Sequence, residues 1–122
     1  FDRRGRVTSE ADLRNHDLIG LDRSDSLIRG FAARGIELTR EEFALRTDDG
    51  MLTWNLLLAG AGIGVGQVVL ARRHPELEQV DAGLKLGALP VWLVMSEEVR
   101  SNARIRRVAD FLSAALGEVL RG

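Results

Sequence analysis

The chain has 122 residues, of which 45% are hydrophobic and 29% charged, a composition typical of a globular domain and not of a disordered segment. Its 17 basic and 18 acidic residues give a net charge of -1, which argues against a domain that grips nucleic acid by itself. Cysteine is absent, which excludes disulfides, thiolate zinc sites and cysteine nucleophiles.

Residues 9–35 are predicted to form a helix, a strand and a second helix. Ser9 and Asp12 have the spacing of a capping box, which favours a short helix. An apolar run of strand length follows at residues 17–22. Ser24 is then placed to cap the next helix, and Gly35 is placed to end it.

The most informative stretch follows a second predicted strand at residues 43–47. Asp48 or Asp49 can cap a largely apolar helix of about ten residues, and Gly60 suits the left-handed position that ends it. Apolar residues then alternate with glycine over residues 62–66, as in a strand that other backbone approaches closely. A helix N-terminus beside such a strand is a common place to hold a small anion.

The last third of the chain ends in a strand and a long helix. Residues 68–70 favour a short helix, and residues 81–89 have the glycine content of a linker or hinge. Residues 90–95 are apolar on both faces, which predicts a central or doubly covered strand. Residues 102–120 carry apolar side chains at three- and four-residue steps, which predicts an amphipathic helix. The alternation of strands and helices indicates an α/β fold with a mostly parallel sheet.

Four segments, in order and at the right spacing, resemble one protein family, the effector-binding (substrate-binding) domain of LysR-type transcriptional regulators. The similar segments are TSEADLRNHDLIGLD at 8–22, TDDGMLTWNLLLAGAGIGV at 47–65, LARRHPELEQV at 70–80 and LPVWLVMSEEVRSNARIRRVADFLSAAL at 89–116. Each motif alone is weak, whereas four in register are fairly specific. The chain begins at Phe1 and not at methionine, so we expect it to be a piece of a longer protein, truncated on its N-terminal side.

The resemblance implies a fold like that of type 2 periplasmic binding proteins, with two Rossmann-like subdomains and an effector in the cleft between them. Residues 1–86 would be the second subdomain. Residues 87–122 would return through the hinge and supply a strand and the last helix to the first subdomain. The family's N-terminal helix-turn-helix, which binds DNA, would lie in the missing part. Strand 90–95 and helix 102–120 would then need a partner, either a second copy or other polypeptide.

Candidate effector-binding residues lie where the two predicted strands end and the capped helix begins. The candidates are Ile19, Gly20, Thr47, Asp48, Asp49, Gly50, Met51 and Gly64. Ligands of open α/β sheets bind at strand ends, but plain core strand is the favoured interpretation for Ile19 and Gly20, and Thr47 could equally be a buried strand threonine. For Asp48 to Gly50, helix capping is an alternative to effector contact, and both can hold. Two aspartates would repel an anion, so the backbone amides are the expected donors.

No pattern in the chain indicates a cofactor, a metal or catalysis. The glycines of residues 60–66 do not fit the G-x-G-x-x-G spacing of a dinucleotide fingerprint, and a helix precedes them where a strand is needed. His16 and His74 are far apart and lack metal-ligand spacing. The arginines of residues 104–107 are interpreted as the solvated face of a helix.

The leading hypothesis is the sensing domain of a cytoplasmic LysR-like regulator. Its expected partners are a small organic anion as effector and further copies of the chain in a homo-oligomer. Contact with DNA would occur only through the missing N-terminal domain, and no membrane partner is expected. A binding module of a periplasmic solute receptor and a fragment of a small α/β enzyme using Asp48 or Asp49 are the alternatives. The longest apolar run, residues 56–71, is too polar to span a membrane, and no signal peptide is visible.

Overall fold

The computed structural model describes residues 4–80 and 82–121, and the chain divides into two units, Phe1–Leu86 and Gly87–Gly122. Phe1 and Asp81, at the predicted starts of the second subdomain and of the hinge, lie outside the described residues. Each unit is described by itself.

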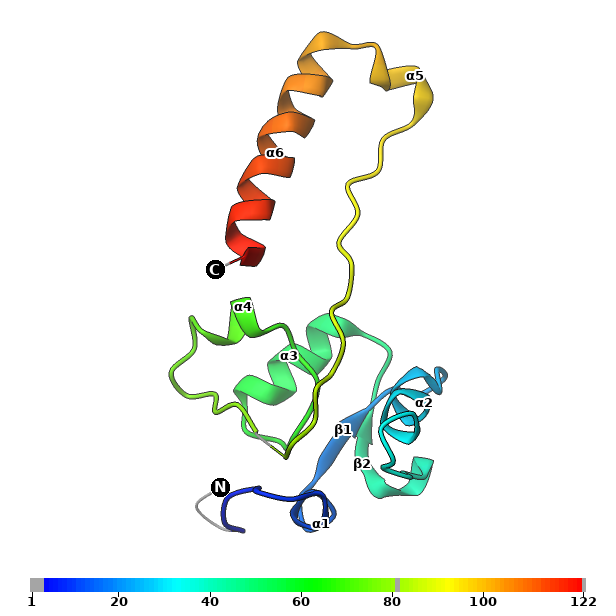
Figure 1. The fold of residues 1–122 in the computed structure, drawn as a ribbon, viewed down its shortest axis with the longest axis vertical. Helices are drawn as coiled ribbons and strands as arrows, with labels where there is room; N and C mark the ends of the chain where they lie inside the picture. Colours follow the sequence, from blue (N-terminus) through cyan, green and yellow to red (C-terminus); the bar gives the residue numbers. More distant parts are fainter. Residues whose placement is uncertain (1–3, 81, 122) are drawn as a thin grey trace. The chain divides into compact units, whose positions relative to one another are not determined.

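The first unit alternates helices with two parallel strands (Figure 1). Its elements in chain order are α1 (Glu10–Leu13), β1 (Leu18–Gly20), α2 (Ser26–Ala32), the 3-10 helix η1 (Arg40–Glu42), β2 (Phe43–Arg46), α3 (Gly50–Leu58) and α4 (Val68–Ala71). This is a mixed α/β unit, as the alternation in the sequence predicted. The sheet contains two strands in the described residues.

β1 lies in the middle of the strand pairing. Leu18 pairs with Phe43 of β2 on one side and forms a parallel bridge with Ile63 on the other. Two hydrogen bonds of 2.8 Å flank this bridge, from the Ile63 amide to the Asp17 carbonyl and from the Ile19 amide to the Ile63 carbonyl. The predicted glycine-rich strand is therefore reduced to a bridge at one residue. The predicted close approach of backbone is confirmed, because a Cβ atom at Gly62 would lie 2.2 Å from the Asp17 carbonyl oxygen.

The helix ends follow the local sequence, with one correction. Ser9 and Asp12 form the predicted capping box at the start of α1. Gly35 and Gly60 adopt positive φ angles of 84° and 69°, as expected for residues that end helices. Ser24 was predicted to cap α2, but Asp25 occupies the cap position. Ser24 instead turns back locally, and its Oγ accepts from the amide of Ser26 at 3.2 Å.

The core of the first unit lies around β1 and β2. Its buried side chains are all apolar and come from several segments of the chain. One cluster contains Val7, Leu13, Leu18, Ile36, Leu38 and Phe43, with Ile28, Phe31, Ile63, Val80, Ala82 and Leu84 packed against them, and Ile19 is buried as well. Packing of Val80, Ala82 and Leu84 on this cluster makes the last part of the unit a part of its core.

The second unit contains a short helix and a long helix. α5 (Glu97–Arg100) was not predicted, whereas α6 (Ala103–Arg121) confirms the amphipathic helix. The Asn102 side chain accepts from the amide of Arg104 at 3.0 Å and so caps α6. The strand predicted at residues 90–95 was wrong for this structure, where the segment is extended but unpaired. The described part of residues 87–122 offers no second strand to pair with it, and Trp92 is 81% exposed.

Candidate functional site

Two loops meet where the parallel strands end. Because β1 and β2 run in the same direction, the loop at residues 21–25 and the loop at residues 47–49 leave the sheet at the same edge. The Thr47 amide donates to the Gly20 carbonyl at 3.0 Å, so the pairing continues one residue beyond β2. The carboxyl edge of a parallel sheet is where ligands of open α/β folds bind.

Asp48 joins these two loops. Its carboxylate accepts hydrogen bonds from the main-chain amides of Asp22, at 3.0 Å, and Arg23, at 3.1 Å. The two residues are 26 and 25 positions away in sequence, so the contact fixes tertiary structure and does not cap a helix. The sequence left helix capping and effector contact open for Asp48. Asp49, and not Asp48, caps α3, and the loop-joining role of Asp48 was not predicted.

Asp49 is the N-cap of α3. Its Oδ1 accepts from the amides of Met51, at 2.8 Å, and Leu52, at 3.0 Å. Its own amide donates to Thr47 Oγ1 at 3.1 Å, which ties the cap to the end of the strand. The two amides of the first turn of α3 are thus already bonded to a carboxylate. An anionic ligand at this edge would have to compete with Asp49 or use other donors.

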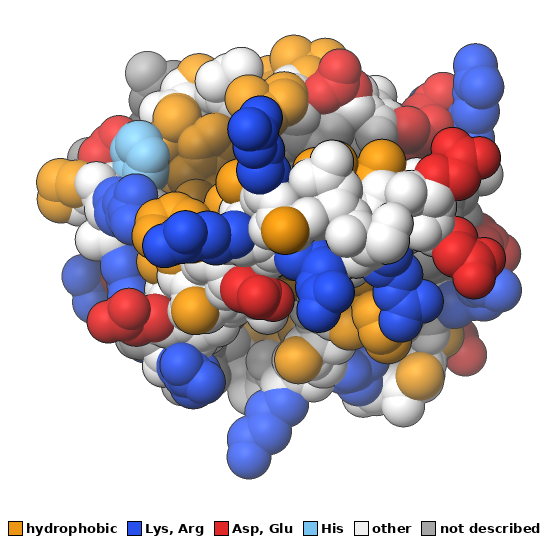
Figure 2. Space-filling view, turned by 90° about the horizontal axis from the view of Figure 1, so that it is seen from above, with side chains coloured by type: hydrophobic (Ala, Val, Ile, Leu, Met, Phe, Trp, Pro, Cys, Tyr) orange, Lys and Arg blue, Asp and Glu red, His pale blue; other side chains and the backbone are white. Residues whose placement is uncertain are grey.

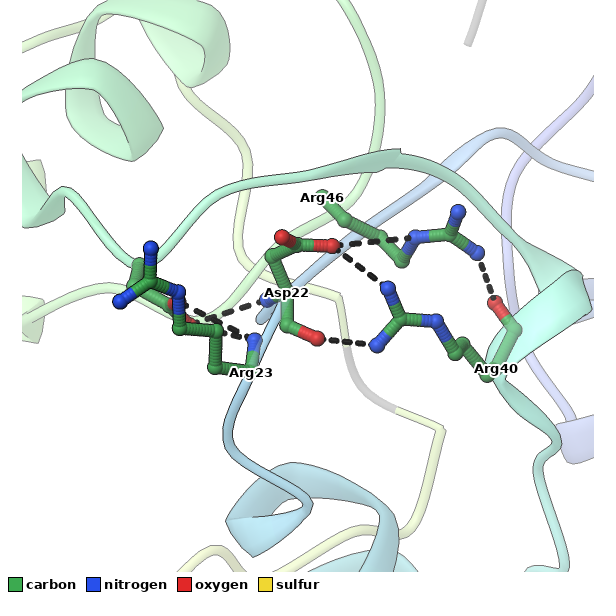
Figure 3. Close-up of polar contacts among 5 residues, drawn as sticks. Asp22, Arg23, Arg40 and Arg46 are labelled. Carbon is green, nitrogen blue, oxygen red and sulfur yellow. Dashed lines mark hydrogen bonds and ion pairs between the residues drawn. The ribbon is translucent and has the colours of Figure 1, made fainter.

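A cluster of charged side chains at the same edge was missed from the sequence. Arg40 Nη2 lies 2.7 Å from Asp22 Oδ1, and Arg40 Nη1 donates to the Asp22 carbonyl oxygen. Arg46 Nε lies 3.8 Å from the same Oδ1, and its Nη1 donates to the Arg40 carbonyl at 3.0 Å. Figure 3 shows both guanidinium groups directed at Asp22. Asp22 ends the strand predicted at residues 17–22 and Arg46 lies within the strand predicted at residues 43–47, but no short-range pattern indicated that they pair.

The structure gathers most of the predicted residues but gives them different surroundings. Gly20, Thr47, Asp48, Asp49, Gly50 and Met51 follow one another along this edge. Ile19 is 2% exposed and belongs to the core, whereas Met51 is 72% exposed and free to meet a ligand. A Cβ atom at Gly64 would meet the side chains of Leu57 at 3.2 Å and Ile19 at 3.3 Å, so this position is one of close packing.

The ionisable groups with shifted pKa values are Asp12, Glu42 and Glu76, and none of these three belongs to the loops at residues 21–25 and 47–49. The pKa of Asp12 is lowered chiefly because the Thr8 amide donates to its carboxylate, and that of Glu42 chiefly by the Thr39 amide. The His74 side chain pairs with Glu76, whose pKa is lowered by the Glu76 amide and then by His74. Within residues 4–80 and 82–121, no three His, Asp or Glu side chains are grouped to hold a metal ion.

The second unit has a groove of different character. It lies between the 90–95 segment and α6, and no charged side chain lines it. The lining residues are Val91, Leu93, Ser113, Leu116, Gly117 and Leu120. Such a surface does not suit a small organic anion. No helix in the part of the chain that the structure describes has the length and hydropathy to cross a membrane.

A parallel α/β unit with two loops joined at the carboxyl edge of its strands has the architecture in which ligands of open α/β sheets bind at that edge. The sequence model of the LysR substrate binding domain family matches residues 1–117, so the chain belongs to that family. Members of this family are effector-binding modules of LysR-type transcription regulators and are not enzymes. The comparison therefore confirms the resemblance found in the sequence. No curated protein and no solved structure matches the chain.

Proposed function

We propose that the first unit senses a small organic anion through the loops at residues 21–25 and 47–49, for a LysR-type regulator that works in the cytoplasm. The supporting observation is the bond network of Asp48, which joins the ends of the two strands. A ligand that touches either loop therefore acts on both. The ligand must bind one loop arrangement more tightly than another, because otherwise it shifts no equilibrium.

In the parent regulator, this shift would change how the DNA-binding helix-turn-helix domains of a homo-oligomer sit on a promoter. Residues 1–86 would serve as the second subdomain of a fold of the type 2 periplasmic-binding-protein kind. Residues 87–122 would return as a strand and a helix of the first subdomain. The family match supports this assignment because it covers both segments.

The experiment is amide chemical-shift mapping of the full 122-residue chain with a panel of small organic acids. We expect saturable shifts at Gly20, Asp22, Thr47 and Met51 for at least one acid. Amides of α1, which has no role in the two loops, serve as internal control. Shifts confined to α1 or to α4, or no saturable shift with any acid, would contradict the proposal.

A further inference from the structure

The carboxylate of Asp22 occupies a position that suits an anionic ligand. It lies between two guanidinium groups, 2.7 Å from Arg40 Nη2 and 3.8 Å from Arg46 Nε. Planar guanidinium groups match carboxylates in shape and can bind them through paired hydrogen bonds. Asp22 therefore satisfies with its own side chain the groups that would otherwise recognise a carboxylate from outside.

Two arginines share the one carboxylate of Asp22. The remaining contacts of their side chains are with main-chain carbonyls of Asp22 and Arg40, which carry no net charge. The Asp48 carboxylate in this region is bonded to the amides of Asp22 and Arg23 and to neither of these two arginines. The side chains of Asp22, Arg40 and Arg46 are 47%, 50% and 33% exposed. Solvent can thus reach the cluster. An exposed ion pair of this kind is only weakly stable, so a competing anion can replace it.

Asp22 is also the residue through which the loop at residues 21–25 is held. Its amide donates to Asp48, its carbonyl accepts from Arg40, and its side chain pairs with both arginines. Replacement of the side-chain contact would remove one of these three attachments. The loop could then rearrange while Asp48 still joins it to the loop at residues 47–49.

We propose that the effector carries a carboxylate that displaces Asp22 from Arg40 and Arg46, so that Asp22 acts as an internal competitor and couples ligand binding to the loop. This inference rests on the proposed function, since it names the chemical group recognised at that edge. The alternative is an ion pair that only stabilises the fold. The two explanations predict different effects of removing the Asp22 carboxylate on ligand affinity. Removal of a competitor tightens ligand binding, whereas removal of a purely structural ion pair does not.

The test is calorimetric titration of the full chain with succinate at low ionic strength, with neutral succinamide as ligand control. We expect Asp22→Asn to tighten the succinate dissociation constant about two- to fivefold, the range of an exposed ion pair. Glu10→Gln is the matched control, because it removes the same charge from a separate pair with Arg14, on α1 and outside both loops. Its effect should be smaller and should come only from net charge.

The arginine variants give the opposite change. We expect Arg40→Gln and Arg46→Gln to weaken succinate binding at least about fivefold. Arg40→Lys keeps the charge but loses the planar fork, and should also weaken binding while the amide spectrum stays dispersed. Equal effects of Asp22→Asn and Glu10→Gln, or succinate binding unchanged in all the arginine variants, would overturn the inference. So would a wild-type chain and an Asp22→Asn chain that both ignore succinate at tens of millimolar.

Failure here can be told apart from failure of the proposed function. If organic acids still shift Thr47 and Met51 while the Asp22 and arginine variants bind them as wild type does, the sensing role stands and the displacement of Asp22 falls. If no acid shifts these amides in any variant, the sensing role itself falls.

Discussion

At the residue scale, the lack of a side chain at Gly62 allows the backbone of residue 62 to approach that of Asp17. A Cβ atom there would lie 2.2 Å from the Asp17 carbonyl oxygen, which accepts from the neighbouring Ile63 amide. The obstacle is backbone, which cannot move aside as a flexible side chain can. We expect Gly62→Ala to lower the free energy of unfolding by about 3 kcal/mol, at the upper end of the cost of overpacking.

Gly30→Ala is the matched control for this prediction. Gly30 lies inside α2, and a Cβ atom there would meet nothing within 4 Å. Because alanine favours helix over glycine, this variant should gain up to about 1 kcal/mol. Urea unfolding followed by circular dichroism measures both changes. Equal stability of the two variants would show that the strand bridge at Ile63 contributes little to the free energy of unfolding.

The predictability of the site also differs from residue to residue. The sequence placed a capping aspartate at Asp48 or Asp49, and local chemistry explains why Asp49 does cap α3. It did not reveal Asp48 as the joint between two loops, nor the pairing of Asp22 with Arg40. These contacts span 26 and 18 residues and depend on how the strands are paired, which no short-range pattern encodes.

At the scale of elements, two short helical turns begin with the same kind of hydrogen bond, which main-chain amides donate to a side-chain carboxylate. In α1 the Asp12 carboxylate accepts from the amides of Thr8 and Ser9, both at 2.9 Å. In η1 the Glu42 carboxylate accepts from the Thr39 amide at 2.6 Å. These hydrogen bonds lower the pKa of both carboxyls below their ordinary values of 3.8 and 4.5.

These amide–carboxylate hydrogen bonds predict how the stability of the fold depends on pH. A carboxyl whose pKa is lower in the folded state stabilises the fold above its unfolded pKa, and this contribution is lost as pH falls through the folded value. We expect the double variant Asp12→Asn, Glu42→Gln to be less stable than wild type near neutral pH. The difference should shrink once the pH falls below the ordinary values of 4.5 and 3.8.

The measurement is the urea midpoint of both chains at about pH 7, 5 and 3. The double variant Glu10→Gln, Glu41→Gln removes carboxyls from the same two turns but keeps the two carboxylates that accept the cap hydrogen bonds. Its urea midpoint should fall between about pH 5 and 3 by the same amount as that of the wild type. The prediction would be contradicted if the urea midpoints of the wild type and of the Asp12→Asn, Glu42→Gln variant differed by the same amount at every pH.

The two elements of the second unit show where sequence patterns succeed and fail. Helix α6 was predicted because its hydrogen bonds are internal and the Asn102 cap is local. A strand instead needs hydrogen bonds from a neighbour, and residues 90–95 have none among the described residues. Their apolar pattern is typical of a strand inside a sheet, but the pattern does not show whether neighbouring strands are present to pair with it.

For the whole molecule, the distribution of apolar surface differs between the units. The first unit buries a cluster around its strands, whereas Ala109 is the single buried residue among those described in the second. Val94 is 82% exposed and Phe111 70% exposed. Figure 2 shows hydrophobic side chains on the surface between charged ones. Large exposed apolar surfaces of this kind mark sites of association.

We therefore expect the 122-residue chain to self-associate through α6 and the 90–95 segment. Removal of apolar surface from water stabilises an assembly by roughly 25 cal/mol per Å², and large apolar side chains of both segments are exposed. Light scattering after size exclusion should give a mass that rises with concentration. Phe111→Lys should shift the chain toward monomer, whereas Ala114→Lys should not, because Ala114 lies between Asp110 and Glu118 on the charged face of α6. A monomer at every concentration, with α6 still helical by circular dichroism, would show that this face stays in water without a partner.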